Sequence, residues 1–412
     1  MKSPLWVRGA ARIARQPSKL NAVGSNPTGP ATTTFGKLLC CRLNFISANT
    51  VRETASRWTK LNQQRKLSVP VDLIRTVAIV AVIVLHATRD ATSFQPEAPL
   101  EVWRWWIMDI YQSLSRVGVP LFVMLSGALL LQPSKIEPLN DFFKKRWARI
   151  GLPFLFWGAI YFAWDFFANQ EAFTSSFIVQ GVLSGPYFHF WYLYMLIGLY
   201  IFTPVLRVVV THVDRKTFKY FLIAWLLGPL LMQSLSLFGY TLDSNLLTIP
   251  WWLGYYLLGV YMLNVRVRRR TLLSLSLLGL ALTAVGTYFM AATFGGTQTY
   301  FFQDYFSPTM ILASVTLFLL LKTVQAPQNQ TEPRHTKISL LLRKISENTL
   351  PLYLFHVMII ESLQRGYFSF TISSSTLNSI VEVPLISFVA LFICLAVIVP
   401  LKKIPGLKRL IG

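Results

Sequence analysis

PVDLIRTVAIVAVIVLH, residues 70–86, is an apolar stretch of transmembrane quality that contains three ionisable residues. These are Asp72, Arg75 and His86. At 3.6 residues per helical turn, Arg75 and His86 lie on nearly the same face, roughly 16 Å apart along the axis. Asp72 precedes Arg75 by one turn, within reach of a salt bridge. A charge in lipid costs at least ~2.5–3.5 kcal/mol, so we expect these side chains to face a bundle interior or a wet cavity.

This helix therefore carries a cation near one membrane face and an acid–base group near the other. Histidine titrates near working pH, which makes it suitable as a general base for a hydroxyl. We take His86, with Asp72, as the candidate catalytic group. The structural alternative is that Arg75 pairs with Asp72 and sets topology, while His86 is a hydrogen-bonding residue of the bundle.

The composition indicates a polytopic membrane protein. Hydrophobic residues make up 53% of the 412-residue chain and charged residues only 14%, against about 25% charged in soluble domains. The three cysteines form neither a disulfide framework nor a metal-binding pattern. The sequence has no Gly-rich nucleotide loop, no HExxH and no G-x-S-x-G elbow, which argues against most soluble enzyme classes.

The N-terminal region differs from the rest of the chain. Residues 1–66 hold twelve Lys and Arg and a single acid, Glu53, and their composition predicts a disordered basic tail. The tail lacks the apolar core of a secretory signal. An organellar transit peptide and a translation start placed too far upstream remain alternatives.

From Pro70 onward, ten apolar runs are long enough, or nearly so, to cross a hydrocarbon core of ~30 Å. We therefore expect an all-α, polytopic membrane bundle of about ten transmembrane helices over residues 67–405. The ten runs lie near residues 70–88, 112–131, 149–168, 189–209, 219–238, 249–264, 271–293, 306–322, 349–364 and 381–401.

Lys and Arg concentrate in alternate connections, and the positive-inside rule then places both termini in the cytoplasm. The net charge of +22 thus reflects topology and attraction to anionic lipid, and it gives no nucleic-acid signature. Residues 406–412 form a basic cytoplasmic C-terminus. The polar range 323–348 is interpreted as a linker.

Two further clusters are candidates for a site. Arg146 and Arg149 are three residues apart, so they share one helix face, and paired guanidinium groups can clamp phosphates. Basic clusters at inner helix ends are, however, common in membrane proteins. His189 and Trp191 belong to an aromatic segment that suits either sugar stacking or an interfacial belt.

The last cluster lies near the C-terminus. His356 falls at mid-membrane, and Glu361 lies near the outer end of the same helix. Ionisable residues at such depth are functional candidates, although interhelical hydrogen bonding explains His356 equally well. Asp165 is a lesser candidate of the same kind.

These features together resemble the acyltransferase 3 family, and especially its bacterial surface-polysaccharide O-acetyltransferase branch. The resemblance rests on the Arg-x10-His helix from Arg75 to His86 and on the R-x-x-R motif from Arg146 to Arg149. It also rests on the segments FWYLYMLIGLYIFTPVLR and SENTLPLYLFH.

The resemblance implies transfer of an acyl group, usually acetyl from acetyl-CoA, to a hydroxyl of a surface glycan or lipid-linked saccharide in a bacterial plasma membrane. It implies that His86 is the acid/base residue and that Arg75, Arg146 and Arg149 bind the acyl-CoA. His189, Trp191 and Glu361 are our acceptor-side candidates. We expect acetyl-CoA as a donor substrate, no permanently bound cofactor and no metal. A glycolipid or organic-anion transporter is the alternative, although no pair of broken helices marks an inverted repeat.

Overall fold

The computed structural model describes residues 70–88, 99–132, 137–170, 174–240, 251–294, 299–324, 337–372 and 378–412. The chain divides into two units, residues 1–54 and 55–412, and all the described residues belong to the second. Within these ranges every regular element is a helix. The predicted tail, residues 1–66, lies outside the described residues.

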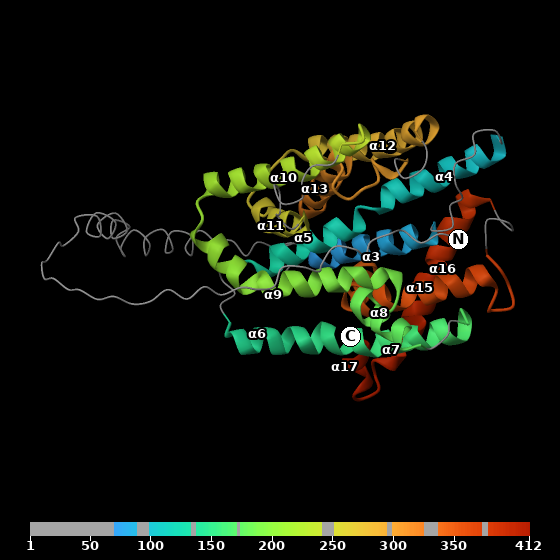
Figure 1. Ribbon diagram of the computed structural model, residues 1–412. Helices are drawn as coiled ribbons and strands as arrows, with labels where there is room; N and C mark the ends of the chain where they lie inside the picture. The colour runs from blue at the N-terminus through green and yellow to red at the C-terminus, as the bar shows by residue number, and fades with distance from the viewer. Residues whose placement is uncertain are drawn as a thin grey trace, which may run out of the picture. The chain divides into compact units, whose positions relative to one another are not determined.

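Figure 1 labels most of the helices and colours them in chain order from blue to red. They are α3 (Val71–Ala87), α4 (Pro99–Ser115), α5 (Gly118–Leu130), α6 (Leu139–Arg146), η1 (Trp147–Gly151), α7 (Leu152–Ala168), α8 (Ser175–Ser184), η2 (Phe188–Phe190), α9 (Trp191–His212), α10 (Arg215–Leu237), α11 (Trp251–Met262), α12 (Arg269–Thr293), α13 (Pro308–Lys322), α14 (Lys337–Glu347), α15 (Thr349–Arg365), α16 (Ser379–Leu401) and α17 (Leu407–Ile411).

Each of the ten predicted runs overlaps a helix. Among the described residues, six helical stretches are long and apolar enough to cross a membrane. They span residues 102–130, 139–168, 175–212, 215–235, 269–293 and 379–401. The helices α3, α11, α13 and α15 are shorter than the 18 residues that such a span requires. The all-helical class and the membrane-spanning character are therefore confirmed, while the count of ten and the cytoplasmic termini stay predictions.

The helix α3 lies inside the bundle and contacts α4, α5, α13, α14, α15 and α16 (Figure 1). Its apolar residues Ile74, Ala78 and Ile79 are completely buried. Contact with helices around most of its circumference explains why α3 is nearly uniformly apolar between its charged ends.

The helices α5 and α11 approach each other at reciprocal glycines. A Cβ atom on Gly127 would lie 1.8 Å from the carbonyl oxygen of Tyr256, and one on Gly259 would lie 1.8 Å from that of Met124. Only hydrogen fits in either place, so the two backbones touch. Small residues bring membrane helices together in this way.

One prediction about the inner connections is wrong. The range 323–348, interpreted as a linker, contains the helix α14, while residues 325–336 lie outside the described residues. The helix packs on α3, where the Thr76 hydroxyl donates to the Leu342 carbonyl at 3.1 Å. Its apolar residues recur at helical spacing, a signal that the polar composition of the preceding residues obscured.

Candidate active site

Three histidines from separate elements meet at the C-terminal end of α3. The His86 ring lies 5.1 Å from the His356 ring of α15 and 6.4 Å from the His189 ring of η2, measured between centroids. Phe188 covers His86 from 5.2 Å. His189 and His356 are fully buried. The structure thus brings the two predicted site histidines, His86 and His189, together with His356.

The tautomer of His356 follows from its contacts. Its Nδ1 lies 3.1 Å from the Leu352 carbonyl oxygen, and because that oxygen only accepts, Nδ1 carries the proton. The Nε2 atom of His356 therefore has a lone pair, and within the described part of the chain it makes no hydrogen bond. The lone pair of Nε2 is therefore buried, and no described group donates a hydrogen bond to it.

A cavity of about 290 Å³ lies beside His86. Its walls come from α3, from the segment before α9 and from α15. The lining residues are His86, Tyr187, Phe188, Val357, Ile360, Glu361, Gln364 and Arg365. The cavity thus combines an imidazole, a carboxylate, an amide and a guanidinium group with an apolar wall, a composition typical of a small-molecule site.

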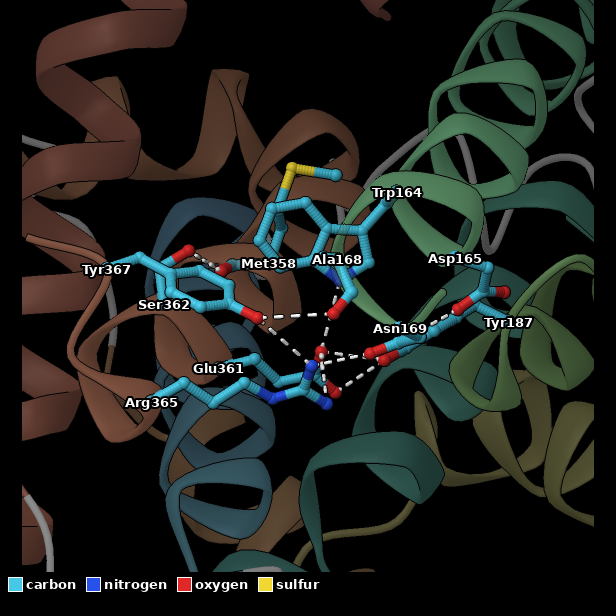
Figure 2. Close-up of polar contacts among 10 residues, drawn as sticks. All are labelled: Trp164, Asp165, Ala168, Asn169, Tyr187, Met358, Glu361, Ser362, Arg365 and Tyr367. Carbon is cyan, nitrogen blue, oxygen red and sulfur yellow. Dashed lines mark hydrogen bonds and ion pairs between the residues drawn. The ribbon is translucent and has the colours of Figure 1, made fainter. Parts of the chain in front are cut away.

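The carboxylate of Glu361 is held from several sides, as Figure 2 shows. The Tyr187 hydroxyl lies 2.6 Å from both carboxylate oxygens, and Trp164 Nε1 donates to one of them at 3.2 Å. Arg365, one turn along α15, lies 3.8 Å away and also donates to Asn169. These contacts fix the position of Glu361 and satisfy a negative charge in a largely buried place.

Arg75 lies at the opposite end of α3. Its guanidinium group is within electrostatic range of Arg149 and of the phenols of Tyr192 and Tyr200 on α9. Tyr200 in turn interacts with Arg146 as well as with Arg149. Tyr200 thus interacts electrostatically with all three predicted arginines.

The R-x-x-R motif is not a regular helix. A single π-turn, η1, separates Arg146, the last residue of α6, from the start of α7, and Arg149 lies within it. The side chain of Arg146 is 17% exposed, whereas Arg149 is exposed. The π-turn was not predicted, and such turns are frequent at functional sites.

Asp72 acts electrostatically on Arg75 but is not paired with it. It is exposed, and although both side chains are described, no ion pair joins it to Arg75. The salt bridge expected between them is therefore absent. Fourteen residues of helix separate Asp72 from His86, about 21 Å, so Asp72 has no contact with the cavity.

Two other candidates lie outside the cavity wall. Trp191, 36% exposed, packs against Trp252 and Tyr305 at 5.5 and 6.1 Å between ring centroids. It belongs to an aromatic cluster that does not line the cavity. Asp165 is buried and accepts a hydrogen bond from Asn169 at 2.5 Å, at the rim of the Glu361 network.

Sequence reasoning missed Tyr187, Trp164 and Arg365 as site residues. Arg365 sits one turn after Glu361, a spacing that predicts an ion pair, whereas nothing local marks the two aromatic partners. Within the described ranges, no group of three or more His, Cys, Asp or Glu side chains is placed to hold a metal ion.

Fold and site together define a multi-pass membrane protein with an arginine cluster at one end of a central helix and, at the other end, a cavity whose wall includes His86. A family model for the acyltransferase domain matches residues 70–399. The chain therefore belongs to the acyltransferase 3 family. No curated protein and no solved structure matches it.

Proposed function

We propose that this protein is an O-acyltransferase of a bacterial plasma membrane that moves an acetyl group from acetyl-CoA to a hydroxyl of a surface glycan or lipid-linked saccharide. One observation supports it above all others. The single helix α3 carries Arg75, among arginines, at one end and His86, in a cavity wall, at the other.

The arginine cluster suits the donor. Arg75, Arg146 and Arg149 come from three elements, and guanidinium groups bind phosphate oxygens with two parallel hydrogen bonds. With the phosphates held there, the thioester arm has to extend roughly 16 Å along α3 to reach His86.

The cavity suits the acceptor. In the proposed reaction an imidazole nitrogen of His86 takes the proton of the acceptor hydroxyl while its oxygen attacks the thioester carbonyl carbon. A carbon–oxygen bond forms, the carbon–sulfur bond breaks, and the thiolate of coenzyme A receives the proton from His86. Both Glu361 and Gln364 line the cavity; in this proposal Glu361 accepts hydrogen bonds from neighbouring hydroxyls of the sugar, and the Gln364 amide accepts or donates them.

The remaining candidates take supporting roles. His189 is fully buried behind His86 and is assigned to holding the cluster. Trp191 lies outside the cavity wall, so it suits a more distant part of an extended acceptor. Asp72, at the far end of α3, is no longer assigned to the catalytic step.

The test is deletion of the gene, followed by mass spectrometry of the cell-envelope glycans. Complementation with the wild type restores one acyl group per repeating unit, whereas His86→Ala does not. His212→Ala serves as the matched control, because His212 is exposed at the far end of α9, and it restores acylation fully. Normal acylation with His86→Ala contradicts the mechanism.

A transporter is the second candidate, and ligand stabilisation separates it from an acyltransferase. A ligand that binds only the folded protein raises its melting temperature. We expect acetyl-CoA to stabilise the purified protein in detergent. A transporter is indifferent to acetyl-CoA and responds to its cargo.

A further inference from the structure

The Glu137 carboxylate is shared among three cations close to the donor end of the molecule. It lies 2.9 Å from Lys145 Nζ, 3.3 Å from one Arg207 nitrogen and 3.7 Å from one Arg146 nitrogen. The side chains of Glu137, Arg146 and Arg207 are only 18%, 17% and 12% exposed. One negative charge thus faces three positive charges, and a positive excess remains.

The two arginines are held in place by groups other than Glu137. Both guanidinium groups lie over the Phe142 ring, Arg146 at 4.7 Å and Arg207 at 5.0 Å from its centroid. Phe142 is completely buried. Arg207 Nε also donates to the Leu130 carbonyl at 2.6 Å. Their positions are therefore preorganised for an anion.

This cluster is continuous with the proposed donor site. Arg146 belongs to both, since its guanidinium carbon lies 5.8 Å from the centre of the Tyr200 ring, which also interacts electrostatically with Arg75 and Arg149. On α9, Arg207 follows Tyr200 by seven residues, two helical turns, so both project from one face. Arg207 thereby extends the arginine group toward Glu137.

Ordinary surface ion pairs on this protein look different. Arg343 and Glu347, one helical turn apart on α14, pair at 2.8 Å with side chains 62% and 58% exposed. A pair of this kind contributes little. Glu137, in contrast, binds cations from two separate helices, α6 and α9. Its contact with Arg146 occupies a guanidinium group that the proposed function assigns to the donor phosphates.

We propose that Arg207 is a fourth phosphate-binding arginine of the donor site and that Glu137 is an internal stand-in for a phosphate, which the phosphates of acyl-CoA displace. The inference rests on the proposed function, because it assumes an acyl-CoA donor at this end. In the absence of donor, Glu137 offsets part of the positive charge of Arg146 and Arg207. When donor binds, the Glu137 side chain turns away and its place is taken by phosphate oxygens, which carry more charge and suit the guanidinium fork better.

The test is titration of the purified protein in detergent with coenzyme A, which has the phosphates but no acyl group to transfer. Glu137→Gln and Glu137→Ala remove the competing charge, and both should bind coenzyme A about tenfold more tightly. Arg207→Gln should bind it about tenfold more weakly, with Arg207→Lys intermediate because it keeps the charge but lacks the fork. Monodispersity and melting temperature verify that each variant is folded.

Two controls sharpen the result. Glu347→Gln removes one negative charge that pairs with Arg343 and not with Arg146 or Arg207, and it should leave the affinity for coenzyme A unchanged. Pantetheine, which lacks the adenosine phosphates, should bind all variants equally. A parallel titration in nanodiscs with and without phosphatidylglycerol tests whether a lipid headgroup supplies the phosphate.

The outcomes separate this inference from the proposed function. If coenzyme A binds the wild type, the Glu137 variants and the Arg207 variants with the same affinity, the inference alone is overturned. A wild type that does not bind coenzyme A overturns the proposed donor and the inference with it. A response confined to phosphatidylglycerol overturns the assignment of this cluster to the donor.

Discussion

Replacement of Tyr187 by phenylalanine removes one hydroxyl from the Glu361 network and leaves the ring that packs on Tyr161 and Phe188. That hydroxyl bridges both carboxylate oxygens at 2.6 Å. A hydrogen bond to a charged group contributes about 1.5–3 kcal/mol. Trp164 and Arg365 still contact Glu361 in the variant, so we expect a loss near the lower end, about 1.5 kcal/mol in unfolding free energy.

The same change should weaken acceptor binding. If Glu361 orients the acceptor, loss of this hydrogen bond should also weaken its hold on the transition state, and a weakening of about 1.4 kcal/mol corresponds to a tenfold fall in kcat/KM for the acceptor. The assay is transfer of labelled acetyl from acetyl-CoA, with acceptor and donor varied in turn. The KM for acetyl-CoA should not change, because the donor phosphates bind at the other end of α3.

The control is Tyr194→Phe, which also removes one hydroxyl, bonded to the Val182 carbonyl on α8 away from the cavity. We expect this variant to retain wild-type kinetics. If Tyr187→Phe leaves both the melting temperature and the acceptor kcat/KM at wild-type values, Glu361 has no positioning role and the acceptor assignment fails.

Two further predictions concern stability. Hydrogen bonds from Lys145 and from Arg207 hold the pKa of Glu137 below its usual range despite partial burial. The ionised Glu137 therefore stabilises the folded protein at any pH above the carboxyl pKa of the unfolded chain, about 4.3. This stabilisation is lost as pH falls through the lower pKa of the folded protein. The melting temperature of Glu137→Gln should therefore depend less on pH between about 5 and 3 than that of the wild type, and equal slopes contradict this. Gly259→Ala places a methyl group against the Met124 carbonyl and should destabilise the fold by about 3 kcal/mol, the upper end of what overpacking typically costs. Gly198→Ala, with open space around it, should be neutral or stabilising by up to about 1 kcal/mol. Similar melting temperatures for the two variants contradict the close contact of α5 and α11.

The sequence predicts much of the α3 arrangement because the relevant signals are local. The run between Arg75 and His86 is apolar apart from Thr76. It predicts a helix, and the eleven-residue spacing predicts how far apart the two ionisable groups lie. The order of apolar and basic segments likewise predicts where helices occur. The helix α14 was missed because its short pattern adjoins a polar stretch.

The site could be predicted only in part, because its contacts join residues far apart in the chain. Tyr187 and Glu361 are 174 residues apart, and Trp164 and Glu361 are 197 apart. Hydropathy places such residues at the same end of a bundle but does not say which of them touch. Asp72 illustrates the converse, since correct helical spacing from Arg75 did not produce an ion pair.

The helix α3 is short for the task proposed for it. Its 17 residues rise about 25 Å, while the hydrocarbon core of a typical bilayer is about 30 Å thick. Because α3 is enclosed by other helices, and the six candidate spans around it are longer, its two ends lie below the headgroups, deeper in a thicker bilayer, and substrates reach them only where water enters the bundle. Bilayer thickness thus becomes a variable of the reaction, and reconstitution in lipids of increasing acyl length is expected to slow transfer without altering a single side chain.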